Sequence, residues 1–284
     1  MVFQFEHVVQ QWHETWGKWR PKPFDLVALK RVLSRWQYAL ADDGWNSLFW
    51  GNHDLPRTVS KYGDDKAFRV ESAKMLAIAL HFLKGTPYVY QGEEIGMTNV
   101  AFESIEEYRD VETLNMYKEM VNEKGLDPKE VLKIVRAKSR DNARTPMQWD
   151  ANEQAGFTKG VPWIKVNPNY KEINVSQALG DPNSVFYYYQ KLIQLRRENP
   201  VIVYGAYDLI LDSHEEIYAF TRTLDDDRLL VILNFGANSP IFNLPENIHF
   251  VSSTLLIGNY KVDSPNDVRK LTLRPYEARV YRLR

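Results

Sequence analysis

The chain has 284 residues, no cysteine, and 36 Lys and Arg against 37 Asp and Glu, which gives a formal net charge of -1. That balance argues against a nucleic-acid or membrane-surface partner, because either would bind concentrated positive charge. The lack of cysteine excludes disulfides, thiolate nucleophiles and cysteine-based metal sites. With 44% hydrophobic and 13% aromatic residues the chain can bury a large core, and it contains no apolar run of about 18 residues that would predict a membrane span.

Strands and helices alternate in the N-terminal third of the sequence. Residues 1–5 are an apolar run that predicts a buried strand, and because the run starts at the first residue, the chain is expected to begin inside a domain. Apolar residues at steps of three and four predict a helix over 24–40, followed by a strand at 44–49. A largely buried helix at 66–83 leads through a Gly-Thr-Pro turn to a strand at 88–90. This alternation is typical of parallel βα units.

The pattern changes twice in the remainder of the chain. Helices are predicted at 106–118, 127–138 and 184–198, with an irregular connection before the last one. After the Asn-Pro pair at 199–200 the sequence breaks into short alternating runs that predict an antiparallel β module, at 207–211, 217–222, 229–234 and 280–283. We therefore expect an α/β region over 1–198 followed by an all-β antiparallel sandwich domain over 199–284.

The segment from Asn52 to Arg57 concentrates polar side chains directly after the strand at 44–49. Active sites of parallel βα barrels lie at this end of the strands. His53 can donate to hydroxyl groups, Asp54 can accept from two vicinal hydroxyls, and Arg57 can hold a carboxylate, a combination that suits a sugar. The alternative is a structural loop in which Asp54 caps the following turn.

Four segments give the chain a specific resemblance. Residues 48–57 (LFWGNHDLPR) resemble the fourth signature region of the α-amylase family, family 13 of the glycoside hydrolases, and residues 85–97 (GTPYVYQGEEIGM) resemble its eighth barrel strand. Residues 140–149 (RDNARTPMQW) and 166–170 (VNPNY) are typical of its exo-acting α-glucosidase branch, which includes oligo-1,6-glucosidases and trehalose-6-phosphate hydrolases. The resemblance covers essentially the whole chain and implies hydrolysis of terminal α-glucosidic bonds in short oligosaccharides.

The resemblance assigns roles to individual residues. Asp54 matches the carboxylate that stabilises the transition state, and His53 matches a substrate-binding neighbour, with Arg57 in the same motif. Arg140 matches an arginine that lines the sugar pocket, and Glu112 matches a carboxylate on the acceptor side. For Arg140 and Glu112 a surface ion pair remains the alternative. No cofactor or metal ion is implied, since the family's calcium-type site belongs to the first barrel strand.

The two other catalytic carboxylates of the family are not found in this sequence. Retaining glycosidases need a nucleophile and an acid/base about 5 Å apart, and the resemblance places both on barrel strands four and five. Glu6 falls after the general acid, and Glu93 and Glu94 belong to the eighth strand's motif. A complete (β/α)8 TIM barrel takes about 250 residues, so the resemblance implies strands six to eight, the C-terminal half of the enzyme.

Several expectations follow from an incomplete barrel. Strands six and eight would present unpaired edges, so the chain should be poorly soluble, self-associate, or depend on the missing N-terminal half of the same enzyme. Alone it should show no turnover, and the alternatives are a non-catalytic carbohydrate-binding remnant or a purely structural role. Residues 9–19 do not match the loop usual after the sixth strand. The habit of the branch implies a cytoplasmic protein, and linkage preference stays open.

Overall fold

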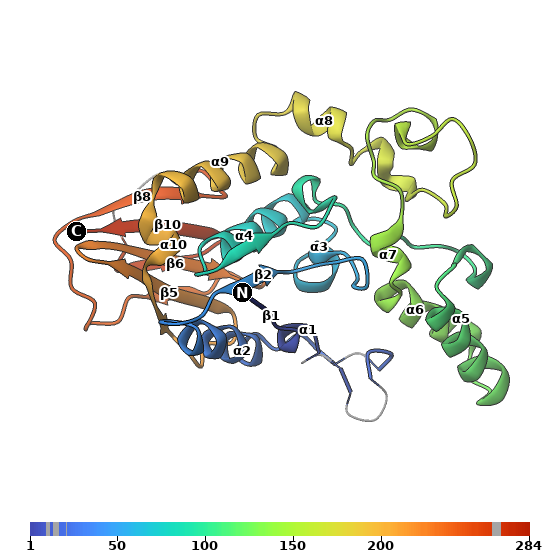
Figure 1. Cartoon of the computed structure of the whole chain (residues 1–284), viewed down its shortest axis with the longest axis horizontal. Helices are drawn as coiled ribbons and strands as arrows, with labels where there is room; N and C mark the ends of the chain where they lie inside the picture. The colour runs from blue at the N-terminus through green and yellow to red at the C-terminus, as the bar shows by residue number, and fades with distance from the viewer. Residues whose placement is uncertain (10–11, 14–16, 21, 263–267) are drawn as a thin grey trace.

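The computed structural model describes every residue except 10–11, 14–16, 21 and 263–267. Part of the unmatched loop at 9–19 therefore lies outside the described residues. Figure 1 shows the chain as an elongated molecule with an antiparallel sheet at one end, a short parallel sheet in the middle, and a helical extension at the other end.

The short parallel sheet forms as the sequence predicts. Within the described chain it consists of β1 (Val2–Phe3), β2 (Asn46–Phe49) and β3 (Thr86–Tyr88), in that spatial order and all parallel. Helices connect successive strands, as parallel pairing requires. The three βα steps agree with the α/β expectation for this region.

The two long helices between these strands match their predictions closely. In α2 (Leu26–Ala39), Asp25 caps the first turn by accepting from the Ala28 amide at 2.9 Å, and Leu29 lies on the buried stripe. In α4 (Arg69–His81) the buried residues surround the helix on nearly all sides. A helix that is apolar all round needs neighbours on every side, and α9 (Val185–Glu198) supplies one of them.

Two strand predictions were wrong in detail. The first strand is not buried, because β1 is an edge strand on which Val2 is 40% and Phe3 50% exposed. It ends at Phe3, and a helical turn, α1 (Glu6–Val9), follows. The third strand begins at Thr86 instead of 88 and therefore contains Pro87. Proline lacks an amide hydrogen, and β3 tolerates it because β3 forms the other edge of the sheet.

The helical extension is more broken than expected. The predicted helix at 106–118 splits into a 3-10 turn, η2 (Ile105–Glu107), and α5 (Val111–Lys118). The backbone becomes extended at Tyr108, which ends η2, and Asp110 caps the start of α5. The predicted helix at 127–138 is α6 (Pro128–Lys138). Several short helices had no clear sequence signal: α3 (Thr58–Tyr62), α7 (Asp141–Arg144), α8 (Val175–Gly180), α10 (Pro200–Tyr204), and the turns η1 (Glu93–Ile95), η3 (Glu119–Glu123), η4 (Glu153–Gly156) and η5 (Pro168–Lys171).

The C-terminal region forms an antiparallel sheet in the order β4-β5-β6-β10-β8, with a separate β7-β9 pair. The strands are β4 (Ala206–Ile210), β5 (Ile217–Leu224), β6 (Asp227–Asn234), β7 (Ile241–Asn243), β8 (Ser253–Gly258), β9 (Lys270–Thr272) and β10 (Ala278–Leu283). Alternation along β5 sends Ile217 and Ala219 toward the β7-β9 side and Tyr218 and Phe220 toward the helices. Both faces of this sheet are therefore buried.

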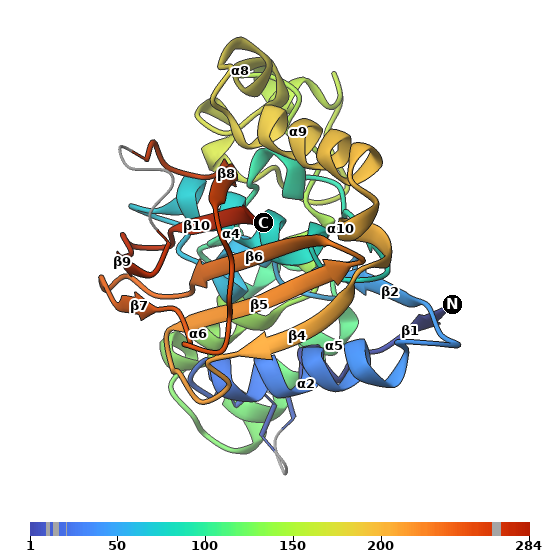
Figure 2. The same cartoon turned by 90° about the vertical axis from the view of Figure 1, so that its left-hand side faces the viewer.

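Two buried cations tie the helices to this sheet. Lys30 of α2 has no exposed surface, and its Nζ donates to the carbonyls of Leu211 and His214 at 2.7 Å and of Ile217 at 3.1 Å. Arg222 of β5, equally buried, donates to the carbonyls of Phe82 and Gly205. In Figure 2, α2 runs along β4. The main core is therefore shared between residues on both sides of position 199.

Candidate active site

The loop that follows β2 holds Asp54 in a defined position. The Asp54 amide donates to Oδ1 of Asn52 at 2.8 Å, which closes a side-chain turn, and Leu55 is buried beneath the loop. Asp54 does not cap the next helix, because α3 begins after Arg57 without a side-chain cap. The Asp54 carboxylate is instead turned toward the guanidinium groups of Arg140 and Arg144.

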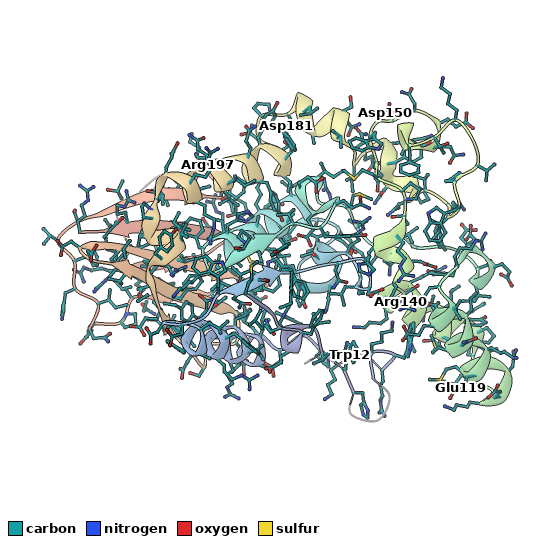
Figure 3. All side chains as sticks on the ribbon, viewed as in Figure 1. Trp12, Glu119, Arg140, Asp150, Asp181 and Arg197 are labelled. Atoms are coloured by element: carbon teal, nitrogen blue, oxygen red, sulfur yellow. The ribbon has the colours of Figure 1, made fainter. Side chains whose placement is uncertain are left out.

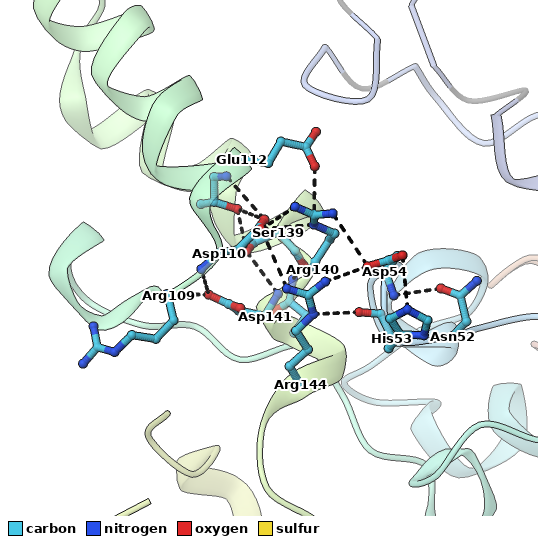
Figure 4. Close-up of polar contacts among 12 residues, drawn as sticks. Asn52, His53, Asp54, Arg109, Asp110, Glu112, Ser139, Arg140, Asp141 and Arg144 are labelled. Atoms are coloured by element: carbon cyan, nitrogen blue, oxygen red, sulfur yellow. Dashed lines mark hydrogen bonds and ion pairs between the residues drawn. The ribbon is translucent and has the colours of Figure 1, made fainter. Parts of the chain in front are cut away.

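Two arginines at α7 hold the Asp54 carboxylate (Figure 4). Nη2 of Arg144 donates to Oδ1 of Asp54 at 2.6 Å, and its Nε donates to the carbonyl of His53 at 2.9 Å. Nη1 of Arg140 lies 3.7 Å from the same Oδ1. On the other side, Nε2 of His53 lies 3.3 Å from Oδ2 of Asp54. The carboxylate is half-exposed, so it can still meet a ligand.

The buried carboxylate of Asp110 holds the Arg140 guanidinium in place. Its Oδ1 accepts from Nη2 and Nε of Arg140 at 2.6 and 3.1 Å, and its other oxygen accepts from the amide and hydroxyl of Thr113. Burial of the carboxyl opposes ionisation, but the hydrogen bonds from Arg140 and Thr113 hold the pKa of Asp110 below its usual value. The same Asp110 hydrogen bond raises the pKa of Arg140. Asp110 is therefore a fixed negative charge that orients the Arg140 guanidinium.

Glu112 completes the polar cluster at the start of α5. Its Oε2 accepts from Nζ of Lys18 at 2.8 Å and lies 3.4 Å from Nε of Arg140. Among the described residues, the ion pairs of this cluster join three carboxylates, those of Asp54, Asp110 and Glu112, and three cations, those of Lys18, Arg140 and Arg144. Since these charges balance, the cluster favours a neutral ligand with many hydroxyl groups over an ion.

A cavity of about 520 Å³ opens beside this cluster, and Asp54, Glu112 and Arg140 line it. Trp12 and Trp19 line it as well, and Trp12 is 38% exposed. Figure 3 marks Trp12 and Arg140 on the two segments that face each other here. An aromatic face next to carboxylates and guanidinium groups matches a sugar ring, which has apolar C–H faces and a polar rim.

Two predicted residues do not line this cavity. His53 lies beside Asp54 without lining it, and Arg57 lies in the protein interior. Arg57 is held there by backbone carbonyls. It is 3% exposed, and its guanidinium donates to the carbonyls of Gln91 at 2.6 Å and Asn142 at 3.0 Å. Burial lowers the pKa of Arg57 to about 10. Its contacts join the loop after β2 to the loop after β3 and to α7, so it fixes the elements that carry Asp54 and Arg144.

Sequence reasoning missed Arg144, Asp110 and Lys18. Arg144 carried a usable signal, because it lies four residues after Arg140 in the quoted motif at 140–149, and one helical turn places such residues on the same side. Asp110 precedes α5 as an acidic cap. Lys18 lies in an irregular loop with no such signal.

No group of three or more His, Asp or Glu side chains among the described residues is arranged to hold a metal ion. None of the helices in the described ranges combines the length and apolarity needed to cross a bilayer.

Comparison with family models assigns most of the chain. Residues 1–205 match the α-amylase catalytic domain, and residues 217–280 match the C-terminal domain described for the α-amylase SusG. The chain belongs to the α-amylase family. Its fold is accordingly the α-amylase family fold, a TIM barrel followed by a C-terminal antiparallel β-sheet domain, and the chain matches about half of that fold.

Individual curated relatives show which members of the family the chain resembles in sequence. The chain is 59% identical over 284 residues to an oligo-1,6-glucosidase from Parageobacillus thermoglucosidasius, covering 100% of this chain and 50% of that protein. It is 49% identical to a trehalose-6-phosphate hydrolase from Bacillus subtilis, again covering 100% of this chain and 50% of the relative. The chain thus spans about half the length of the curated relatives it matches.

Solved structures of relatives have the same fold as this chain. The crystal structure of the trehalose-6-phosphate hydrolase from Bacillus licheniformis superposes with a TM-score of 0.95 at 50% identity, covering 100% of this chain and 51% of that one. An isomaltulose synthase from a Klebsiella species gives a TM-score of 0.91 at 37% identity, covering 99% and 50%. These two relatives share the fold and are named for different reactions, hydrolysis of trehalose 6-phosphate and synthesis of isomaltulose.

Proposed function

We propose that this chain is the C-terminal half of a retaining α-glucosidase, similar to oligo-1,6-glucosidases, that hydrolyses terminal α-glucosidic bonds of short oligosaccharides. The observation that carries the proposal is the meeting of Asp54, Arg140 and Glu112 at one charge-balanced cavity, beyond the carboxyl end of the parallel strands. This is the end at which barrel enzymes bind their substrates.

In this mechanism Asp54 accepts hydrogen bonds from hydroxyls of the terminal glucose. These bonds strengthen as the ring flattens toward an oxocarbenium-like transition state, which lowers the barrier. Arg144 and Arg140 hold the carboxylate in place, so little reorganisation is needed at the moment of reaction. His53 donates to a neighbouring hydroxyl, and Trp12 packs against an apolar sugar face.

The nucleophile and the general acid come from chain outside these 284 residues. Glu93 is a poor substitute, because it is 7% exposed and its Oε1 accepts from the Thr58 hydroxyl at 2.6 Å. The match to about half of each relative supports a barrel in which β1, β2 and β3 are strands six, seven and eight. The domain boundary near residue 198 belongs to the same proposal, as does a cytoplasmic location, which cell fractionation would test.

Reconstitution tests this function. The 284-residue chain would be mixed with the N-terminal half of the Parageobacillus thermoglucosidasius relative, and hydrolysis of p-nitrophenyl α-glucoside would be followed. Each half alone should be inactive and the mixture active. An Asp54→Asn chain should lower the activity of the mixture at least about a hundredfold, whereas Asp226→Asn, in an exposed turn of the β domain, should not. Turnover by the chain alone, or an active Asp54→Asn mixture, would contradict the assignment.

A second candidate is a carbohydrate-binding protein without catalysis. It is favoured by one observation, that an exposed aromatic side chain, Trp12, lines the cavity together with Asp54 and Arg140. Calorimetric titration with isomaltose and maltose separates the two functions. Saturable binding to the isolated chain, together with an inactive mixture, would support the binding protein over the enzyme.

A further inference from the structure

A second cavity, of about 420 Å³, shares no lining residue with the cavity beside Asp54. It is bounded by α3, the C-terminal end of α6 and the segment at 99–101. Five basic side chains line it: Lys22, Lys61, Lys133, Arg136 and Lys138. Asp65 is the acidic residue among its lining side chains. Basic side chains therefore predominate in the described lining, in contrast to the balanced cluster around Asp54.

Lys61 and Lys138 make this lining unusual, because both are only partly exposed and neither forms an ion pair with a carboxylate of the described residues. In the part of the chain that the structure describes, the Lys61 ammonium lies 3.4 Å from the carbonyl of Val8 and 4.6 Å from the ring centre of Tyr62. Burial, and secondly the charge of Lys138, lowers the pKa of Lys61 to about 7, and burial lowers the pKa of Lys138. Both lysines lie in the last turns of their helices, where carbonyl dipoles offset only part of the charge.

The other basic residues are only partly neutralised. Lys133 is paired with Glu130 at 2.6 Å on the outer side of α6. The Nε of Arg136 donates to the carbonyl of Phe102 at 2.8 Å. The two terminal nitrogens of this guanidinium are then available to donate to a ligand. Arginine presents five donor hydrogens, so the remaining ones can face a ligand.

Neutral donors complete the lining. The Ser60 hydroxyl accepts from the amide of Asn99 at 2.9 Å and keeps its own hydrogen to donate. The Asn99 side-chain nitrogen makes only long contacts, of 3.4 and 3.5 Å, to the carbonyls of Arg136 and Ala137. The cavity thus combines ammonium, guanidinium, hydroxyl and amide donors around one space.

We propose that this cavity binds a phosphate group, either inorganic phosphate or the phosphate of a phosphorylated sugar. A phosphate offers two negative charges and several acceptor oxygens, and lysine and arginine are the residues that bind it. The compact ammonium groups of Lys61 and Lys138 would share one phosphate, which relieves their mutual repulsion. The site is separate from Asp54, and its occupation does not depend on the proposed glucosidase activity.

Calorimetric titration of the 284-residue chain tests the phosphate site. Inorganic phosphate and glucose 6-phosphate would be added at pH 7, with sodium chloride keeping the ionic strength constant. We expect one saturable site per chain, and Lys61→Met and Lys138→Met should each weaken binding about tenfold or more, as for loss of a charge-assisted hydrogen bond. Lys129→Met, on the same helix α6 but outside the cavity, is the matched control and should bind as the unaltered chain does.

The two ligands identify the source of the phosphate. Tighter binding of glucose 6-phosphate indicates a phosphorylated sugar, and equal affinities indicate phosphate itself. The proposal is overturned if neither ligand gives saturable heat, or if Lys129→Met weakens binding as much as the two cavity variants. Circular dichroism of each variant shows whether it is folded, and if Lys61→Met unfolds, the comparison of Lys138→Met with Lys129→Met still decides the question.

Discussion

The Arg144 guanidinium donates both to the side chain of Asp54 and to the backbone carbonyl of His53, the residue before it. Nη2 lies 2.6 Å from Oδ1 of Asp54, and Nε lies 2.9 Å from the carbonyl of His53. The planar guanidinium therefore fixes both the carboxylate and the loop that carries it. Such a preset geometry is what a group that stabilises a transition state requires.

Arg144→Met should lower kcat/KM of the reconstituted enzyme by roughly ten- to a hundredfold, because Asp54 loses its closest hydrogen-bond donor. Arg144→Lys should recover only part of the loss, since an ammonium group restores the charge but cannot reach both acceptors. Steady-state kinetics of the three mixtures measures this. Arg109→Met, whose guanidinium binds the carbonyls of Glu106 and Tyr108 away from Asp54, is the control. Equal activities of Arg144→Met and Arg109→Met would contradict a positioning role.

Glu93 should make stability depend on pH. Burial raises the pKa of this carboxyl to about 7, against the lowering effect of its hydrogen bond to Thr58. Between pH 4.5 and about 7 the folded state binds more protons than the unfolded state, so this carboxyl stabilises the fold less as pH rises.

Glu93→Gln, which cannot titrate, should therefore gain about 3 kcal/mol relative to the unaltered chain between pH of about 4 and 8. Urea unfolding followed by tryptophan fluorescence at fixed protein concentration measures the difference. The exposed Glu103→Gln is the matched control. A Glu93→Gln difference that stays constant with pH would show that Glu93 is ionised alike in both states.

The residues that the sequence located best are those whose role is local. The apolar stripe through Leu29 predicted a helix over 24–40, and α2 spans Leu26–Ala39. The motif around Asp54 placed that residue at a strand end. Arg57 shows the limit of such reasoning, because its burial depends on carbonyls of Gln91 and Asn142, far away in sequence. Nothing in the helical pattern of 24–40 distinguishes the buried Lys30 from an exposed lysine.

Lys30→Met should destabilise the chain by about 2–4 kcal/mol, because three buried carbonyls lose their donor. The loss should appear as a lower urea midpoint for unfolding of the antiparallel sheet, since the carbonyls belong to the segment between β4 and β5 and to the start of β5. Arg31→Met, at the exposed neighbouring position of α2, should change stability by no more than about 0.5 kcal/mol. If the two variants unfolded at the same midpoint, the Lys30 contacts would contribute nothing to stability.

The edges of the parallel sheet should make the isolated chain associate. β1 and β3 form its two edges, and Phe3, Phe5 and Tyr88 beside them are 50%, 52% and 40% exposed. Exposed strand edges bearing aromatic side chains pair with other chains. Sedimentation velocity should show species larger than a monomer that grow with concentration, and the complementary N-terminal half should convert them to a one-to-one complex.

Lysine substitutions distinguish association through this strand edge from nonspecific association through exposed apolar side chains. Phe3→Lys combined with Phe5→Lys should reduce self-association, because a charge at a strand edge opposes pairing. It should also weaken the one-to-one complex, since the same edge would meet the partner strand. Val251→Lys, which replaces a side chain that is 97% exposed in the β domain, should do neither. A compact monomer of the unaltered chain that unfolds in one sharp transition would show that these edges need no partner.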